Sequence, residues 1–126
     1  MTALTSVSVI GLGAMGYVIA ETFVKAGFST TVWNRSIEKA SPLAAKGAHV
    51  AKTVVKAVEA NKLIIICVLD NNVVDDILTL AGSSLRDRIV INYTHGIPGD
   101  AIASSKIVAA NGGQYLDSAI LHTPQS

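Results

Sequence analysis

The 126-residue sequence is poor in cysteine and in charge, and both shortages narrow the range of functions. A single cysteine, Cys67, excludes an internal disulfide and a cysteine-rich metal site, and it favours the reducing cytoplasm as the location. Charged residues make up only 15% of the chain, and ten basic against nine acidic residues leave a net charge of +1. Because these charges are spread along the chain, we expect no surface for nucleic acid or for an anionic membrane.

Long apolar runs and targeting signals are also missing. The longest apolar run, Leu63–Leu69, is far too short to cross a bilayer, and the first ten residues lack the pattern of a signal peptide. No repeat, low-complexity tract or linker interrupts the sequence, so we expect one domain spanning residues 1–126. Half of the residues are hydrophobic, which is too apolar for disorder and suggests a sheet covered on both faces.

Short β-rich segments alternate with segments of helical composition from one end of the chain to the other. This alternation is typical of βαβ units, and it predicts an α/β fold with a doubly wound parallel sheet, the Rossmann fold. The expected strands are Ser6–Ile10, Thr30–Trp33, Ala48–Val50, Leu63–Val68, Arg88–Asn92 and Gln114–Leu116. The expected helices begin near Ala14, Ser36, Thr53, Asn71 and Pro98.

Residues at the helix boundaries support this division. Glycines stand where helices are expected to end, at Gly27, Gly47 and Gly82. Suitable N-cap residues stand where helices are expected to begin, at Ser36, Thr53 and Asn71. Pro42 falls inside the second helical segment, where it predicts either a kink or a later start of the helix.

A glycine-rich turn separates the first expected strand from the first expected helix. It consists of Gly11, Leu12, Gly13, Ala14, Met15 and Gly16. Glycines at this spacing, directly after a strand and at the start of a helix, are the fingerprint of dinucleotide binding. Gly11 permits the tight turn, Gly13 leaves room for the pyrophosphate, and Gly16 lets helix and strand pack closely. The free N–H groups and the positive end of the helix dipole then face the phosphates. The alternative interpretation is that the glycines serve close packing alone and bind no ligand.

The end of the second expected strand predicts which dinucleotide is bound. Proteins that bind NAD place Asp or Glu there, whereas this chain reads Asn34-Arg35-Ser36. Arg35 can form a charge-assisted fork with a 2′-phosphate, Ser36 can donate a hydrogen bond, and Lys39 follows on the same helix face. We therefore predict NADP(H) over NAD(H), the alternative being a solvated arginine beside an N-cap serine.

Together these segments resemble the β-hydroxyacid dehydrogenase superfamily, and within it the imine reductases. The resemblance covers essentially the whole chain and rests on Val9–Gly16, Val32–Ser36, Gly47–Ala48, Cys67–Asp70, Ile91–Pro98 and Tyr115–Ile120. Hydroxyacid dehydrogenases carry an acidic-x-Ser-Thr motif after the fifth strand, whereas Ile91–Pro98 is similar to the Asn-x-Thr-Ser-Gly-x-Pro pattern of imine reductases. Two departures fall in these motifs: His95 replaces the usual Ser, and Ser118 replaces the usual Gly.

The resemblance implies NADPH-dependent hydride transfer to a C=N bond of a small imine or carbonyl-class substrate. It places Val68, Leu69 and Asp70 near the adenosine and Thr94 near the nicotinamide, where Thr94 is the candidate catalytic residue. Hydroxyacid dehydrogenase-type alcohol oxidation is one alternative. A non-catalytic NADP(H)-binding interaction module is the other.

Enzymes of this superfamily continue into a long helix and a helical second domain that dimerises and closes the substrate pocket, and that domain is absent from this chain. The resemblance therefore implies that the chain binds cofactor but does not turn over substrate alone. We expect an exposed apolar patch around Leu116, Ile120 and Leu121, covered by self-association into a homo-oligomer or by a partner chain.

The remaining reactive side chains are assigned no certain role. His95 is either an acid or base near the carboxyl end of the fifth strand or an exposed loop residue, and the latter is favoured. Cys67 is expected to be a small buried hydrophobe, and Asp75 and Asp76 to lie on a solvated flank. His49 and His122 have no ligand-like spacing to His95, so no metal site is predicted.

Overall fold

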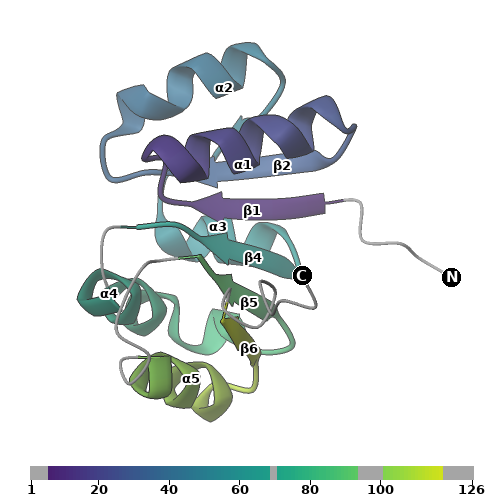
Figure 1. Ribbon diagram of the computed structural model, residues 1–126. Coiled ribbons are helices and arrows are strands. Elements are labelled where there is room, and N and C mark those ends of the chain that lie inside the picture. Colours follow the sequence, from purple (N-terminus) through teal and green to yellow (C-terminus); the bar gives the residue numbers. More distant parts are fainter. Residues whose placement is uncertain (1–5, 69–70, 94–100, 118–126) are drawn as a thin grey trace, which may run out of the picture.

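A computed structural model describes residues 6–68, 71–93 and 101–117, which form a six-stranded, all-parallel sheet with helices on both faces (Figure 1). The sheet order is β3-β2-β1-β4-β5-β6, so the chain winds outward from β1 in both directions. The predicted doubly wound α/β fold is therefore confirmed. The strands are β1 (Ser6–Ile10), β2 (Ser29–Trp33), β3 (His49–Val50), β4 (Leu63–Ile66), β5 (Ile89–Asn92) and β6 (Gln114–Asp117).

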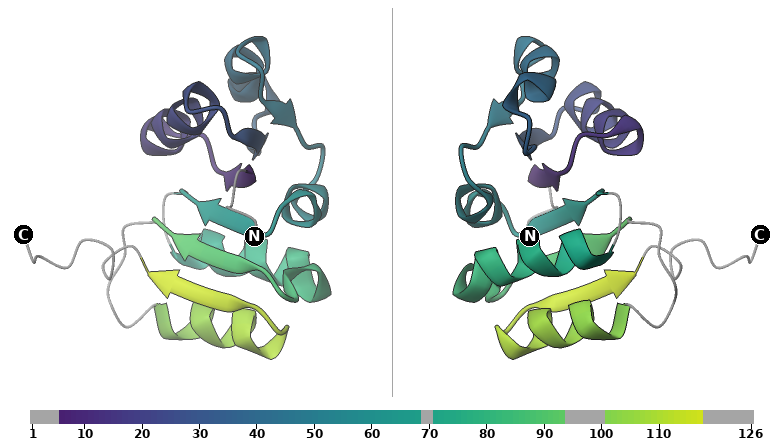
Figure 2. Two further views of the ribbon diagram at one scale, coloured as in Figure 1. Left: turned by 90° about the vertical axis from the view of Figure 1, so that its right-hand side faces the viewer. Right: turned by 90° about the vertical axis from the view of Figure 1, so that its left-hand side faces the viewer.

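Two groups of helices cover opposite faces of the sheet (Figure 2). One face carries α1 (Ala14–Lys25), the 3₁₀ turn η1 (Ile37–Ala40) and α2 (Ser41–Ala45). The other carries α3 (Val54–Ala60), α4 (Asn71–Ala81), the 3₁₀ turn η2 (Gly82–Leu85) and α5 (Ala101–Ala110). None of the helices that the structure describes is both long and apolar enough to cross a bilayer.

The central strands are apolar toward both layers, as a doubly covered parallel sheet requires. Val7 and Val9 of β1 pack in the cluster under α1 and α2, whereas Ile10 packs with Ile64 and Ile66 of β4 under α3 and α4. Ser8 of β1 is polar yet fully buried, and it donates a hydrogen bond of 2.6 Å to the carbonyl of Ala57. Ser8 thereby holds α3 against the strand that leads into the glycine turn.

The predicted elements are found, with differences at their ends. The observed ends of the strands lie within two residues of the predicted ones. The helices α1, α2 and α4 end within two residues of the glycines at which they were predicted to end. Pro42 lies in the first turn of α2, so the helix starts late and is not kinked. The prediction that Ser36 caps a helix is wrong, because its side chain makes no capping hydrogen bond and a short 3₁₀ turn follows. Pro98 lies outside the described residues.

Another correction concerns Asp75, which was expected on a solvated flank. Its carboxylate is half-buried and accepts a hydrogen bond of 2.6 Å from the hydroxyl of Ser104, which is itself fully buried. Asp75 therefore links α4 to α5, whereas Asp76 is exposed as expected. The sequence pattern missed this link because the two residues belong to different helices.

One part of the sheet departs from the expectation that both faces are covered. Within the described ranges, no helix packs over β5 and β6 on the face that α1 and α2 occupy. Ile91 of β5 is half-buried there, and its register partner Leu116 of β6 is 37% exposed. The predicted exposure at Leu116 is therefore confirmed, and Ile120 and Leu121 lie outside the described residues.

Candidate cofactor-binding site

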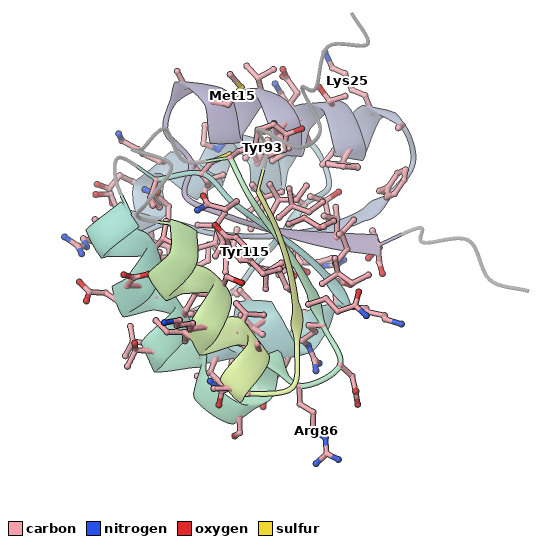
Figure 3. The ribbon with its side chains drawn as sticks, turned by 60° about the horizontal axis from the view of Figure 1, so that its bottom comes forward. Met15, Lys25, Arg86, Tyr93 and Tyr115 are labelled. Atoms are coloured by element: carbon pink, nitrogen blue, oxygen red, sulfur yellow. The ribbon has the colours of Figure 1, made fainter. Side chains whose placement is uncertain are left out.

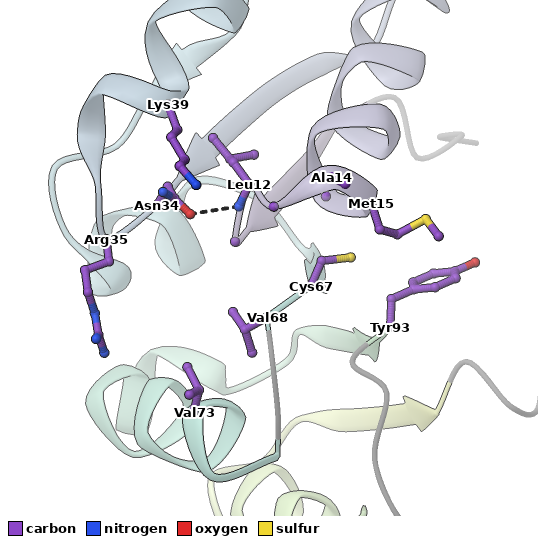
Figure 4. Close-up of a pocket in the computed structure, with 13 residues that line it drawn as sticks. Leu12, Ala14, Met15, Asn34, Arg35, Lys39, Cys67, Val68, Val73 and Tyr93 are labelled. Atoms are coloured by element: carbon purple, nitrogen blue, oxygen red, sulfur yellow. Dashed lines mark hydrogen bonds between the residues drawn. The ribbon is translucent and has the colours of Figure 1, made fainter.

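A pocket of about 390 Å³ opens at the carboxyl ends of the parallel strands (Figure 4). It lies where β1 and β4 are neighbours and the connections leave toward opposite faces, which is the switch point where open α/β sheets bind ligands. Every segment that lines it follows the end of a strand or starts a helix. The lining residues are Gly11, Leu12, Gly13, Ala14, Met15, Gly16, Asn34, Arg35, Lys39, Cys67, Val68, Val73 and Tyr93.

The three glycines of the turn meet different surroundings. Gly11 has a φ of 96°, and a Cβ there would lie 2.0 Å from the carbonyl oxygen of Cys67. A Cβ at Gly16 would lie 1.9 Å from the carbonyl oxygen of Gly11. A Cβ at Gly13 would meet no atom within 4 Å, because this residue faces the open pocket. Gly11 and Gly16 are therefore required by the fold, and Gly13 leaves space for a ligand.

The start of α1 provides hydrogen-bond donors to this space. The N–H groups of Ala14, Met15 and Gly16 belong to the first turn of a 12-residue helix, where no intrahelical acceptor exists. The positive end of the helix dipole lies at the same place, so the turn is suited to an anion such as a pyrophosphate. One donor of the turn is already engaged: the N–H of Leu12 donates to Oδ1 of Asn34 at 2.8 Å.

Two cationic side chains lie at the β2 side of the pocket. Arg35 and Lys39 are both exposed pocket-lining residues, and no salt bridge in the described part of the chain engages either of them. Figure 4 shows Lys39 extending toward the glycine turn, and Arg35 extending on the other side of Asn34. Ser36, which was also predicted, does not line the pocket; its carbonyl accepts hydrogen bonds from Asn34 and Lys39.

The rest of the pocket wall is largely apolar. Val68 and Val73 lie below the glycine turn, and Met15, Cys67 and Tyr93 lie together at one end (Figure 4). Sequence reasoning missed Val73 and Tyr93, although the position of Tyr93 directly after β5 was a usable signal. The predicted residues Leu69, Asp70 and Thr94, and His95 beside them, lie outside the described residues.

Cys67 is confirmed as a small buried residue, since it is 7% exposed and packs in the core under α1. Burial raises the pKa of its thiol to about 11, because a thiolate would lose its hydration there. The thiol is therefore protonated at neutral pH. Among the residues that the structure describes, no three His, Cys, Asp or Glu side chains gather as metal ligands.

A parallel sheet, a strand–glycine turn–helix unit and a pocket at the switch point together define a Rossmann-type dinucleotide-binding domain. Residues 6–122 match the family model described as the NAD binding domain of 6-phosphogluconate dehydrogenase. The chain belongs to this family.

Individual relatives include enzymes and a nuclear factor. An NADPH-dependent reductive aminase of Aspergillus oryzae is 40% identical over 94% of this chain. An imine reductase of Myxococcus stipitatus, solved in complex with NADP⁺, is 37% identical over 89% of this chain, with a TM-score of 0.85. The cytokine-like nuclear factor N-PAC of Drosophila pseudoobscura pseudoobscura is 29% identical over 88% of it. The chain spans 40%, 39% and 19% of these proteins respectively.

We predict that Gly13→Val mainly lowers cofactor affinity, whereas Gly16→Val mainly lowers the stability of the fold. Valine at position 13 fits the extended backbone and open space there, so the free energy of unfolding should fall by no more than about 1 kcal/mol. Its side chain should nevertheless lower dinucleotide affinity at least ~100-fold by filling the phosphate site. Gly16→Val should cost more than about 3 kcal/mol, because its Cβ meets backbone. Urea unfolding and NADPH fluorescence titration measure both effects, and undiminished affinity in Gly13→Val would refute the assignment.

We also predict slow alkylation of Cys67 by iodoacetamide in the folded chain. With a pKa of about 11, only about one thiol in a thousand is ionised at pH 8, so labelling should be at least ~100-fold slower than that of free cysteine. The rate should rise about tenfold per pH unit up to pH 10 while the chain stays folded. The urea-unfolded chain is the control, and equal rates for both forms would contradict the burial of the thiol.

Proposed function

We propose that this chain binds NADPH at the pocket beside the glycine turn. The observation that carries the proposal is the combination of helix N–H groups without intrahelical acceptors and two cations after β2, Arg35 and Lys39, which form no salt bridge among the described residues. A binder of the unphosphorylated dinucleotide would have a carboxylate at the end of β2, and this chain has Asn34. The relatives from Aspergillus oryzae and Myxococcus stipitatus, whose names specify NADPH and NADP⁺, support the same cofactor.

The pocket residues suggest how the cofactor is held. The N–H groups of Ala14 to Gly16 take the pyrophosphate, with Gly13 leaving room for it. Arg35 and Lys39 take the 2′-phosphate. Ser36, which does not line the pocket but follows Arg35 directly, contributes its hydroxyl to the same group. Val68 and Val73, with Leu69 and Asp70, form the adenosine side, and Thr94 lies near the nicotinamide. The last three residues enter through the family resemblance.

For the whole protein we propose reduction of C=N bonds in small imine or carbonyl-class substrates. When bound, NADPH supplies a hydride to the carbon of that bond, and the nitrogen takes up a proton. This chain holds the cofactor, and the rest of the substrate pocket and the proton donor come from a further helical domain. The proposed location is the reducing cytoplasm, as the single cysteine predicts.

A contact between two motifs favours this reaction over alcohol oxidation. Asn92, the last residue of β5, begins the first imine reductase-like motif, and its side-chain amide donates to the hydroxyl of Tyr115 at 2.9 Å. Tyr115 begins the second imine reductase-like motif, so the two diagnostic segments are bonded to each other at neighbouring strands. Asn92 is 1% exposed, so this hydrogen bond is shielded from water.

A chimera tests the proposed reaction. This chain would replace the matching segment of the Aspergillus oryzae reductive aminase, and the rest of that enzyme would supply what this chain lacks. We expect the chimera to reduce a cyclic imine with NADPH, and the same chimera carrying Gly13→Val to be inactive. A folded chimera that binds NADPH but leaves the imine unreduced would contradict the proposal.

The similarity to N-PAC supports a second candidate, a non-catalytic NADP(H)-binding module. N-PAC proteins of several animals, which are named as nuclear factors, match 88% of this chain at 25% to 30% identity. Under this alternative the pocket reports cofactor occupancy to a bound partner. The chimera separates the two candidates, because a binding module would hold NADPH without reducing the imine.

Replacing Arg35 tests the choice of cofactor. We expect Arg35→Ala to weaken NADPH binding about 10- to 100-fold, because a charge-assisted fork is lost, and to change NADH binding less than about twofold. Fluorescence titration of both cofactors gives the four dissociation constants. Arg86→Ala is the matched control, since Arg86 extends into solvent at the opposite end of β5 from Tyr93 (Figure 3). Tighter binding of NADH than of NADPH by the unaltered chain would overturn the assignment.

We further propose that the chain self-associates into a homo-oligomer, or takes up a partner chain, through the uncovered face of β5 and β6. The apolar side chains Ile91 and Leu116 support this interface. We expect sedimentation at rising concentration to show association that Leu116→Glu weakens at least ~10-fold. Leu80→Glu should leave it unchanged, because Leu80 is 65% exposed on α4 at the other face. A strict monomer at high concentration would argue against self-association.

A further inference from the structure

We propose that Asn34 is a positioning residue that couples the two turns of the cofactor site, and that it sets cofactor preference through Arg35. Its side-chain amide bridges segments that are 22 residues apart in the sequence. Oδ1 accepts a hydrogen bond from the N–H of Leu12 at 2.8 Å, and Nδ2 donates one to the carbonyl of Ser36 at 2.9 Å (Figure 4). The inference rests on the proposed function, because it concerns how the NADPH site is held in shape.

The bridge fixes the phosphate turn to the end of β2. The N–H of Gly11 donates to the carbonyl of Trp33 at 2.8 Å, so the bond from Leu12 to Asn34 is the second link between these segments. Two successive links determine the direction in which the turn leaves β1. The remaining N–H groups at the start of α1 then face the pocket, where a pyrophosphate can accept from them.

The other end of the bridge fixes the loop that carries Arg35. The carbonyl of Ser36 accepts from Nδ2 of Asn34 and also from the N–H of Lys39 at 3.1 Å. Arg35 lies between the two residues that this bond joins, so the backbone on both of its sides is held. A pre-ordered loop loses less conformational freedom when the guanidinium binds a phosphate, and affinity rises accordingly.

The bridge needs one acceptor, for the N–H of Leu12, and one donor, for the carbonyl of Ser36. A side-chain amide supplies both, whereas a carboxylate of the same shape supplies only the acceptor. Asp at position 34 could accept from Leu12, but it has no hydrogen to donate to the carbonyl of Ser36. Its charge would also face that carbonyl and repel a 2′-phosphate. With Asn34, position 34 lacks the carboxylate that favours NAD. The same side chain holds the loop that carries Arg35. Asn34 is half-buried, which strengthens both hydrogen bonds relative to exposed ones.

A double-mutant cycle in the 126-residue chain tests this coupling. The variants are Asn34→Ala, Arg35→Ala and the double variant, titrated with NADPH and with NADH. Asn34→Ala should weaken NADH about tenfold, because it loosens the phosphate turn, and NADPH about 60-fold, because Arg35 is then no longer positioned either. Arg35→Ala should cost about 30-fold for NADPH in the unaltered chain and less than about fivefold in the Asn34→Ala background. Asn111→Ala is the matched control, since Asn111 also donates a side-chain hydrogen bond, to Ile107, but does not line the pocket.

Two outcomes of the titration would overturn the inference. An equal cost of Arg35→Ala in both backgrounds would show that Asn34 does not position the arginine. A loss confined to NADPH in Asn34→Ala would show that the bond from Leu12 to Asn34 does not shape the phosphate turn. Asn34→Asp separates the two ends of the bridge, and we expect it to weaken NADPH about 100-fold while retaining the link to Leu12.

Amide hydrogen exchange of the chain without cofactor distinguishes failure of this inference from failure of the proposed function. Asn34→Ala should speed exchange of the N–H groups of Leu12 and Lys39 at least ~10-fold, and Arg35→Ala should leave both unchanged. Unchanged exchange in Asn34→Ala would refute the bridge whatever the chain binds. If the unaltered chain binds neither cofactor but exchange responds as expected, the proposed function fails and the bridge stands.

Discussion

The backbone of the turn after β1 packs so closely against the residue after β4 and against the start of α1 that residues 11 and 16 have no room for side chains. The Cβ positions at Gly11 and Gly16 fall within 2.0 Å of carbonyl oxygens of Cys67 and Gly11. This close approach brings the first turn of α1 directly over the carboxyl end of the sheet. The free N–H groups of the helix, the pocket and the burial of Cys67 all follow from it.

The order of the strands determines what else reaches that place. Because β2 and β4 flank β1 on opposite sides, the cations after β2 and the apolar residues after β4 enter the pocket from opposite directions. A phosphate-rich ligand with a flat apolar ring needs both kinds of surface. The same order places all helices after β3 on one face, which leaves the apolar side of β5 and β6 without a helix in the described part of the chain.

Local signals in the sequence were enough for the fold and for the glycine turn, because apolar runs and glycine spacing are properties of short segments. They were not enough where two distant segments meet. The bond between Leu12 and Asn34, the link from Asp75 to Ser104 and the contribution of Val73 to the pocket depend on tertiary packing. The cap predicted at Ser36 was wrong, because the side chain of Ser36 makes no capping hydrogen bond and the amide of Asn34 bonds to its carbonyl instead. Leu69, Asp70 and Thr94 stay predictions.

The central position of β1 has a consequence for synthesis of the chain. β1 pairs on one side with β2 and on the other with β4, whose residues leave the ribosome more than fifty positions later. Until Leu63–Ile66 has been synthesised, one edge of β1 is unpaired. The carbonyl of Cys67, against which Gly11 packs, is also still missing. The nucleotide pocket is therefore completed late, although the residues of its glycine turn are among the first to be made.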